Sequence, residues 1–144
     1  MNLFSKLQQR QAEGRPLRLG LIGAGKFAAM YLAQVPKTPG VHLAGIADLA
    51  PAGAKTNLER VGWKAAQFAA ASLDAALAKG STHLGDDWEK LVAHPGIDII
   101  VECTGNPVAA VEHCLAAFAN GKHVVAIGDL HVVNVNSTYY GGGV

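Results

Sequence analysis

A Gly-x-Gly-x-x-Ala turn near the amino terminus places the strongest constraint on the fold of this 144-residue chain. Apolar residues 17–22 precede the turn and indicate a buried strand, and the residues that follow indicate a helix over about 26–35. Gly23 permits a tight turn out of the strand, and Gly25 lets the backbone approach a phosphate that any side chain would exclude. Ala28 is small enough for the helix to pack against the strand. The pattern therefore predicts a dinucleotide-binding turn, with the helix N-terminus directed at the pyrophosphate.

Asp48 ends a second predicted strand, over 41–47, about 20 residues beyond the turn, where the dinucleotide fingerprint has an acidic residue. Its carboxylate is expected to accept hydrogen bonds from the adenosine ribose hydroxyls and to repel a 2′-phosphate. This favours NAD as the cofactor, with NADP possible because Lys55 follows nearby. The alternatives are that the glycines form an ordinary tight turn and that Asp48 is a solvated strand end or a cap for the helix at Pro51.

Strand and helix patterns alternate along the whole chain. They predict helices over 3–12, from Pro51 to before Gly62, over 72–79 with Ser72 as cap, from a capping box at Asp86–Glu89 to Pro95, and from Pro107 to before Gly121. Further strands are predicted over 82–84, 97–103 and 123–127, with a weaker sixth over 132–135. This alternation predicts an α/β fold, a Rossmann-type doubly wound parallel sheet in a single domain. We expect a helix over 1–14, an NAD(P)-binding Rossmann domain over 15–136 and a linker-like tail over 137–144.

The turn Thr104-Gly105-Asn106-Pro107 leaves the predicted central strand where the strand order of such a sheet reverses, which is where ligands bind. Asn106 is also placed to cap the following helix, and the two roles are compatible. On that helix one face is shared by Val108, Val111, Leu115 and Phe118.

Composition and charge exclude several classes of function. The formal net charge of +1 comes from 12 basic and 11 acidic residues, so no nucleic-acid partner is predicted. No apolar window of about 18 residues is present, so no membrane partner is predicted. Cys103 and Cys114 are expected to be reduced thiols in a cytoplasmic protein, with Cys103 buried rather than nucleophilic. The six histidines share no ligand spacing, so no metal site is predicted.

Four runs of sequence together resemble the NAD(P)-binding domain of homoserine dehydrogenase-like oxidoreductases, most closely those whose later part carries a SAF domain. They are Leu19–Met30, Gly45–Asp48, Val101–Pro107 and Gly121–Val125. The resemblance covers residues 15–128 and implies cofactor contacts at Gly23, Gly25, Lys26, Phe27, Asp48, Thr104 and Gly105. A sugar oxidoreductase of the Gfo/Idh type would carry Glu-Lys-Pro after the fifth strand, where Ala126-Ile127-Gly128-Asp129 stands here.

These observations predict an NAD(P)-binding domain that positions nicotinamide for hydride transfer. The resemblance implies that the catalytic lysine and the substrate carboxylates lie beyond Val144, so we expect no catalytic residue in this chain and a substrate domain as its missing partner. The full set of candidate cofactor-binding residues is Gly23, Gly25, Lys26, Phe27, Ala28, Asp48, Thr104, Gly105 and Asn106. The alternatives are a non-enzymatic nucleotide-binding or redox-sensing module and a binder of another adenylated ligand such as CoA. A second copy of the chain, in a homo-oligomer, is a further possible partner.

Overall fold

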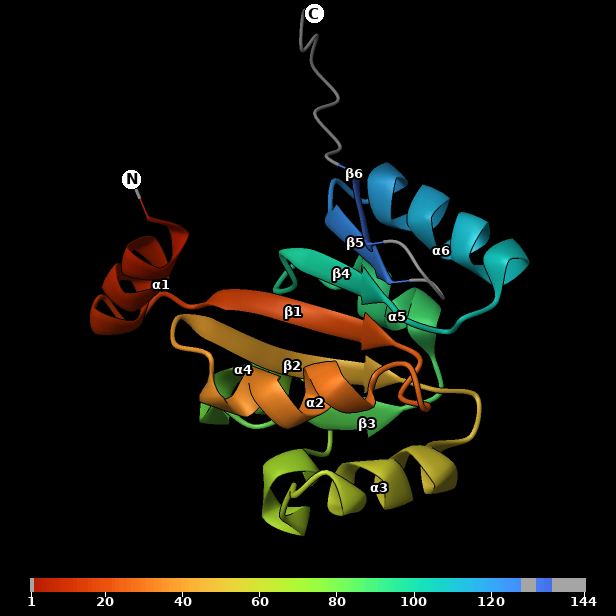
Figure 1. Cartoon of the computed structure of the whole chain (residues 1–144), viewed down its shortest axis with the longest axis horizontal. Coiled ribbons are helices and arrows are strands. Elements are labelled where there is room, and N and C mark those ends of the chain that lie inside the picture. The colour runs from red at the N-terminus through yellow and green to blue at the C-terminus, as the bar shows by residue number, and fades with distance from the viewer. Residues whose placement is uncertain (1, 128–131, 136–144) are drawn as a thin grey trace, which may run out of the picture.

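One sheet organises the structure (Figure 1), a computed structural model that describes residues 2–127 and 132–135. Its strands are β1 (Leu17–Ile22), β2 (Val41–Ala47), β3 (His83–Gly85), β4 (Ile99–Glu102), β5 (His123–Ile127) and β6 (Val132–Val135). Their order is β3-β2-β1-β4-β5-β6, and all neighbours are parallel except β5 and β6. The chain extends the sheet to one side of β1 through β2 and β3, then returns to build the other side from β4. The predicted Rossmann-type doubly wound sheet is therefore confirmed, with an antiparallel strand at one edge.

Helices cover both faces of this sheet. The helices are α1 (Leu3–Ala12), α2 (Ala29–Gln34), α3 (Pro51–Arg60), α4 (Leu73–Lys79), α5 (Trp88–Ala93) and α6 (Pro107–Ala119), with short 3-10 helices at Val35–Lys37 and Ala65–Phe68. Buried side chains of α2 and α3 join one hydrophobic cluster, and those of α5 and α6 join another on the opposite face. Figure 1 shows α2 in front of the sheet, α5 behind it, and α1 beside the layers at the amino end of β1.

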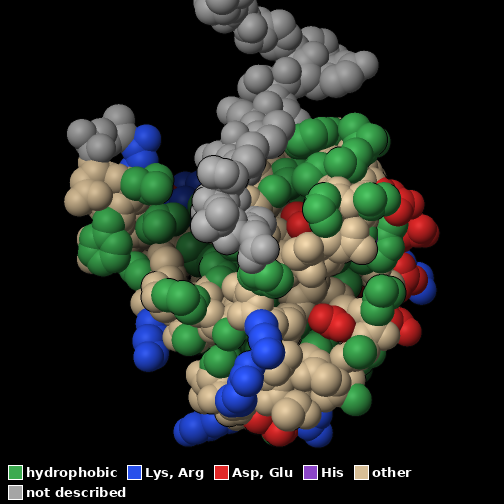
Figure 2. Space-filling view, turned by 45° about the vertical axis from the view of Figure 1, so that its right-hand side comes forward, with side chains coloured by type: hydrophobic (Ala, Val, Ile, Leu, Met, Phe, Trp, Pro, Cys, Tyr) green, Lys and Arg blue, Asp and Glu red, His purple; other side chains and the backbone are tan. Residues whose placement is uncertain are grey.

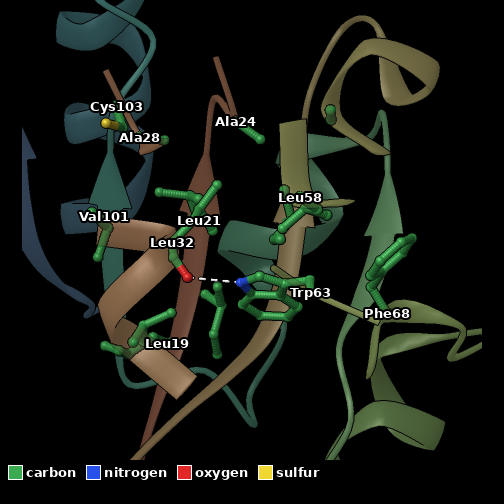
Figure 3. Packing of buried hydrophobic residues seen from close by; sticks show 14 residues of the cluster. Leu19, Leu21, Ala24, Ala28, Leu32, Leu58, Trp63, Phe68, Val101 and Cys103 are labelled. Atoms are coloured by element: carbon green, nitrogen blue, oxygen red, sulfur yellow. Dashed lines mark hydrogen bonds between the residues drawn. The ribbon is translucent and has the colours of Figure 1, made fainter. Parts of the chain in front are cut away.

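The larger hydrophobic cluster joins β1 to α2 and α3. Leu21, Leu32 and Leu58 are fully buried there, and each contributes about 1.5–3 kcal/mol of stabilisation from its removal from water. The indole Nε1 of Trp63 donates a hydrogen bond to the carbonyl oxygen of Leu32 over 2.7 Å (Figure 3). The bond satisfies the one polar atom of a buried tryptophan, so the segment after α3 is tied to α2.

Several predicted boundaries are confirmed and several are wrong. Asn106 and Ser72 cap their helices through their side chains as predicted. The first helix after β1 begins at Ala29 rather than near Lys26, because the residues before it form a tight turn. Asp87 rather than Asp86 is the cap of α5, since its carboxylate accepts the Lys90 N–H group. The strand predicted over 97–103 is shorter, at Ile99–Glu102, and the predicted tail over 137–144 lies outside the described residues.

Most of the apolar stripe predicted on α6 faces away from the sheet, and only Phe118 of its four residues packs partly against the core. Val108, Val111 and Leu115 are 82%, 60% and 62% exposed, whereas His113 and Ala117 are buried. The helix is apolar around most of its circumference, so the hydrophobic pattern alone does not distinguish the buried side from the exposed one. Figure 2 shows hydrophobic side chains gathered over the end of the molecule where Figure 1 places α6.

The ends of β1, β2 and β4 meet at Gly23. Its N–H group donates to the Ala47 carbonyl of β2 over 2.9 Å, and beside it the Cys103 N–H group donates to the Ile22 carbonyl over 2.8 Å. The φ angle of Gly23 is 89°, and a Cβ atom at this residue would lie 2.8 Å from both the Cα and the backbone nitrogen of Thr104. Only glycine allows residue 23 to approach the Thr104 backbone this closely without a shift of the backbone.

Replacing Gly23 with alanine is therefore expected to lower the free energy of unfolding by about 3 kcal/mol or more, because backbone atoms cannot rotate away as a side chain can. The matched control is Gly62→Ala. Gly62 has a similar φ of 97°, but a Cβ atom added there would meet nothing within 4 Å, so a loss of about 1 kcal/mol is expected. Urea unfolding measures the free energy of unfolding of both variants. Equal losses would show that the close approach of Gly23 to Thr104 does not contribute to stability.

Candidate functional site

A cleft of about 560 Å³ opens at the carboxyl ends of the parallel strands. Its walls come from the turn after β1, the residues after β2 and the turn after β4. The strand order reverses between β1 and β4, and ligands of open α/β sheets bind in the crevice at that point. The cleft therefore lies where a doubly wound sheet places its ligand.

The glycine turn forms one wall and offers backbone donors. The N–H groups of Ala28 and Ala29 bond to the carbonyls of Gly25 and Lys26, both over 3.2 Å, which closes the turn. In the described part of the chain no acceptor bonds to the N–H groups of Gly25, Lys26 and Phe27. A Cβ atom added at Gly25 would meet nothing within 4 Å, so a side chain there would enter open space. Free backbone donors beside open space suit an anionic group.

Asp48 holds the glycine turn from the end of β2. Its Oδ2 atom accepts the Ala24 N–H group and its Oδ1 atom accepts the Ala50 N–H group, both over 2.8 Å. Asn57 of α3 holds the same turn from the other side, because its amide donates to the Ala24 carbonyl over 3.0 Å. The half-buried carboxylate thus fixes two loops and still lines the cleft. A carboxylate oxygen accepts more than one hydrogen bond, so the ribose contact predicted for Asp48 is compatible with this arrangement.

The turn after β4 forms the opposite wall. Asn106 caps α6 by accepting the N–H groups of Val108 and Ala109, and the Asn106 N–H group itself donates to Thr104 Oγ1 over 3.2 Å. Gly105 has a φ of 70°, and a Cβ atom there would lie 2.7 Å from the ring of Phe27. The Phe27 ring of the glycine turn therefore packs on Gly105 of the turn after β4, which brings the two turns into contact.

The structure brings most of the predicted site residues to one cleft. Its lining includes Gly23, Gly25, Lys26, Phe27, Asp48, Thr104 and Asn106. Ala28 is fully buried behind the turn, where its small side chain permits close packing. Gly105 lies under the Phe27 ring.

The sequence analysis missed a buried polar cluster beneath the β4 wall. Glu102 is 2% exposed and His113 is 6% exposed, and the Glu102 Oε1 atom lies 3.2 Å from His113 Nδ1. The rings of Trp88 and His113 contact each other with centroids 4.5 Å apart, and both line the cleft. A signal was present, because Glu102 interrupts an apolar strand and His113 lies one helical turn before the buried Ala117.

Cys103 is a buried thiol, as predicted. It is 1% exposed, and burial together with the negative charge of Glu102 raises the pKa of the thiol to about 11. The thiolate is the reactive form, so this residue is a poor nucleophile at neutral pH.

The parallel sheet, the glycine turn and the acidic residue after β2 define a Rossmann-type nucleotide-binding domain. A family model described as "Homoserine dehydrogenase, NAD binding domain" matches residues 3–135. The chain belongs to this family of oxidoreductase NAD-binding domains, which confirms the resemblance to homoserine dehydrogenase-like proteins.

Solved structures of oxidoreductases share the fold. A candidate oxidoreductase from Magnetospirillum magnetotacticum is 29% identical, with a TM-score of 0.55 over 77% of this chain and 29% of that one. Biliverdin reductase from Synechocystis, solved with biliverdin and NADP+, is 24% identical, with a TM-score of 0.52 over 77% of this chain and 29% of that one. Myo-inositol dehydrogenase from Lactobacillus casei, solved with NAD(H) and myo-inositol, is 16% identical, with a TM-score of 0.55 over 77% and 28%. The present chain thus spans less than a third of the length of each.

Among curated proteins the comparison finds no match. No helix in the described part of the chain combines the length and the hydrophobicity that a membrane crossing requires.

The raised pKa of Cys103 predicts how this thiol reacts. In a Cys114→Ala variant, alkylation of folded Cys103 by iodoacetamide is expected to be slow at pH 8 and to accelerate only as the pH approaches about 11, because the thiolate is scarce below that pH. The neutral thiol is favoured in the folded state, so its stabilisation is present below the unfolded pKa and is lost as the pH rises through the folded value.

Mass spectrometry of the alkylated protein gives the rate, and the urea-unfolded variant gives the reference for a free thiol. The reciprocal variant Cys103→Ala reports the half-buried Cys114, whose pKa is also raised by burial. Reaction of folded Cys103 at the unfolded rate at pH 8 would contradict its burial.

Proposed function

We propose that this chain is the cofactor domain of an oxidoreductase and binds NAD in the cleft at the carboxyl ends of β1, β2 and β4. The family match and the nicotinamide cofactors named for the solved structures support a dinucleotide as the ligand. The observation that carries the proposal is the open space at Gly25, with unbonded backbone donors beside it. Such a space admits a pyrophosphate, which a side chain would exclude.

The dinucleotide would lie across the cleft from β2 to β4. Asp48 would receive the adenosine ribose, residues 23–28 the pyrophosphate, and Thr104 and Asn106 the nicotinamide half. Bound nicotinamide supplies the hydride chemistry. The chain's own part would be to hold and orient the cofactor against a substrate presented by a second domain.

The pyrophosphate assignment predicts the effect of Gly25→Val. We expect the parent chain to bind NADH with a dissociation constant on the order of micromolar to millimolar. The valine side chain would occupy the phosphate space, so the constant should rise by at least about 100-fold. Calorimetry or fluorescence titration measures both proteins.

The substitution is also expected to preserve the fold, since Gly25 does not have a positive φ and no neighbouring atom lies within 4 Å of the added Cβ. Gly53→Val is the matched control, because Gly53 lies on the exposed side of α3 outside the cleft lining. Equal NADH affinity of Gly25→Val and Gly53→Val would reject the pyrophosphate assignment.

NAD is proposed over NADP because Asp48 places a negative charge where a 2′-phosphate would lie. The parent should bind NADH at least about tenfold more tightly than NADPH, and in Asp48→Asn this ratio should fall towards one. The ratio of the NADPH and NADH dissociation constants is compared, because loss of the hydrogen bond from the Ala24 N–H group would weaken the binding of both ligands equally. Asp86→Asn is the control, since Asp86 also lines the cleft. An unchanged ratio in Asp48→Asn would remove Asp48 from cofactor selection.

A further inference from the structure

The carboxylate of Glu102 accepts hydrogen bonds from three directions at a single atom. Its Oε1 lies 3.2 Å from the Thr104 N–H nitrogen, 2.5 Å from Thr104 Oγ1 and 3.2 Å from His113 Nδ1. Thr104 Oγ1 already accepts the Asn106 N–H group, so its own proton is free to point at Glu102. A backbone N–H group can only donate. We therefore assign Oε1 as the common acceptor and place a proton on Nδ1 of His113.

In the neutral form of the ring, this assignment leaves the other nitrogen of His113 as an acceptor. In a neutral imidazole one nitrogen carries the proton and the other has a lone pair. Nδ1 points at Glu102, which lies outside the cleft lining, whereas the His113 ring belongs to that lining. With Nδ1 directed at Glu102, we place the Nε2 edge on the side of the cleft, and in the described residues no donor bonds to Nε2. Trp88 packs on the ring at an interplanar angle of 59° and limits its rotation.

We propose that His113 is a cofactor-binding residue whose Nε2 atom accepts a hydrogen bond from the nicotinamide half of the dinucleotide, and that Glu102 is the positioning residue that fixes its ring and tautomer. The inference rests on the proposed function, because the direction of the dinucleotide across the cleft assigns the β4 side to nicotinamide. That half carries neutral hydrogen-bond donors, namely the ribose hydroxyls and the carboxamide NH₂ group. Both suit a neutral imidazole acceptor.

The test compares three ligands on the full chain and on His113→Leu by calorimetry. Loss of one neutral hydrogen bond should raise the dissociation constant of NADH about tenfold. ADP lacks the nicotinamide half, so its affinity should stay within about twofold of the parent value. ADP-ribose separates the two donors: its affinity falls with that of NADH if a ribose hydroxyl is the donor, and is unchanged if the carboxamide is.

Conservative variants test the position of the acceptor. The carbonyl oxygen of His113→Gln reaches the place of Nε2 and should retain most of the NADH affinity, whereas the shorter amide of His113→Asn reaches only the place of Nδ1 and should lose it. Glu102→Gln can place its carbonyl oxygen at the site of Oε1 and should retain most of the NADH affinity, whereas Glu102→Leu removes the common acceptor and should weaken NADH binding about tenfold. His83→Leu is the control, since Nδ1 of His83 is also hydrogen-bonded, to the carbonyl oxygen of Ala70, but His83 lies outside the cleft lining.

Each outcome has one meaning. Failure of the parent chain to bind NADH would reject the proposed function itself. NADH binding by the parent with unchanged affinity in His113→Leu would overturn only the present inference. Equal losses for NADH and ADP in His113→Leu would also overturn it, because they would indicate a structural role for the buried pair. Urea unfolding of each variant confirms that the compared proteins are folded.

Discussion

The cleft depends on the close approach of Gly23, just after β1, to Thr104, just after β4. A missing Cβ atom lets the backbone of the first strand end lie against that of Thr104, at a separation that no other residue permits. The same residue is bonded to the Ala47 carbonyl of β2. Three strand ends are thereby brought to one point, and the loops that follow them become the walls of one cleft.

Two strand-end carboxylates then fix those walls. Asp48 accepts N–H groups from the loops after β1 and β2, and Glu102 accepts both the N–H and the hydroxyl group of Thr104. Hydrogen bonds to an ionised group contribute about 1.5–3 kcal/mol each, more than neutral ones. Loops held in this way lose little conformational entropy when a ligand binds, so the site is largely formed in advance.

The sequence predicted the features that depend on local pattern. The glycine turn, the strand that ends at Asp48 and the cap at Asn106 follow from short-range chemistry that the chain displays directly. The predicted start of α2 is wrong because the N–H groups of Ala28 and Ala29 bond three residues back, as in a turn, where an α-helix would bond four residues back. The polar cluster was missed because Glu102 and His113 are 11 residues apart and meet only when α6 packs on β4.

The orientation of α6 shows why this cluster points to function. The helix turns His113 inward beside the buried Ala117 while Val108, Val111 and Leu115 stay exposed, so hydrophobic burial alone does not account for a polar residue on the buried side. Burying a carboxylate costs several kcal/mol, which its donors offset only in part, and an apolar pair of similar size would stabilise the core at least as well. Sites where local rules are broken without a gain in stability are typically functional. The buried pair of Glu102 and His113 lies against the cleft, so a contact between the His113 imidazole and a ligand would explain why this polar pair is buried.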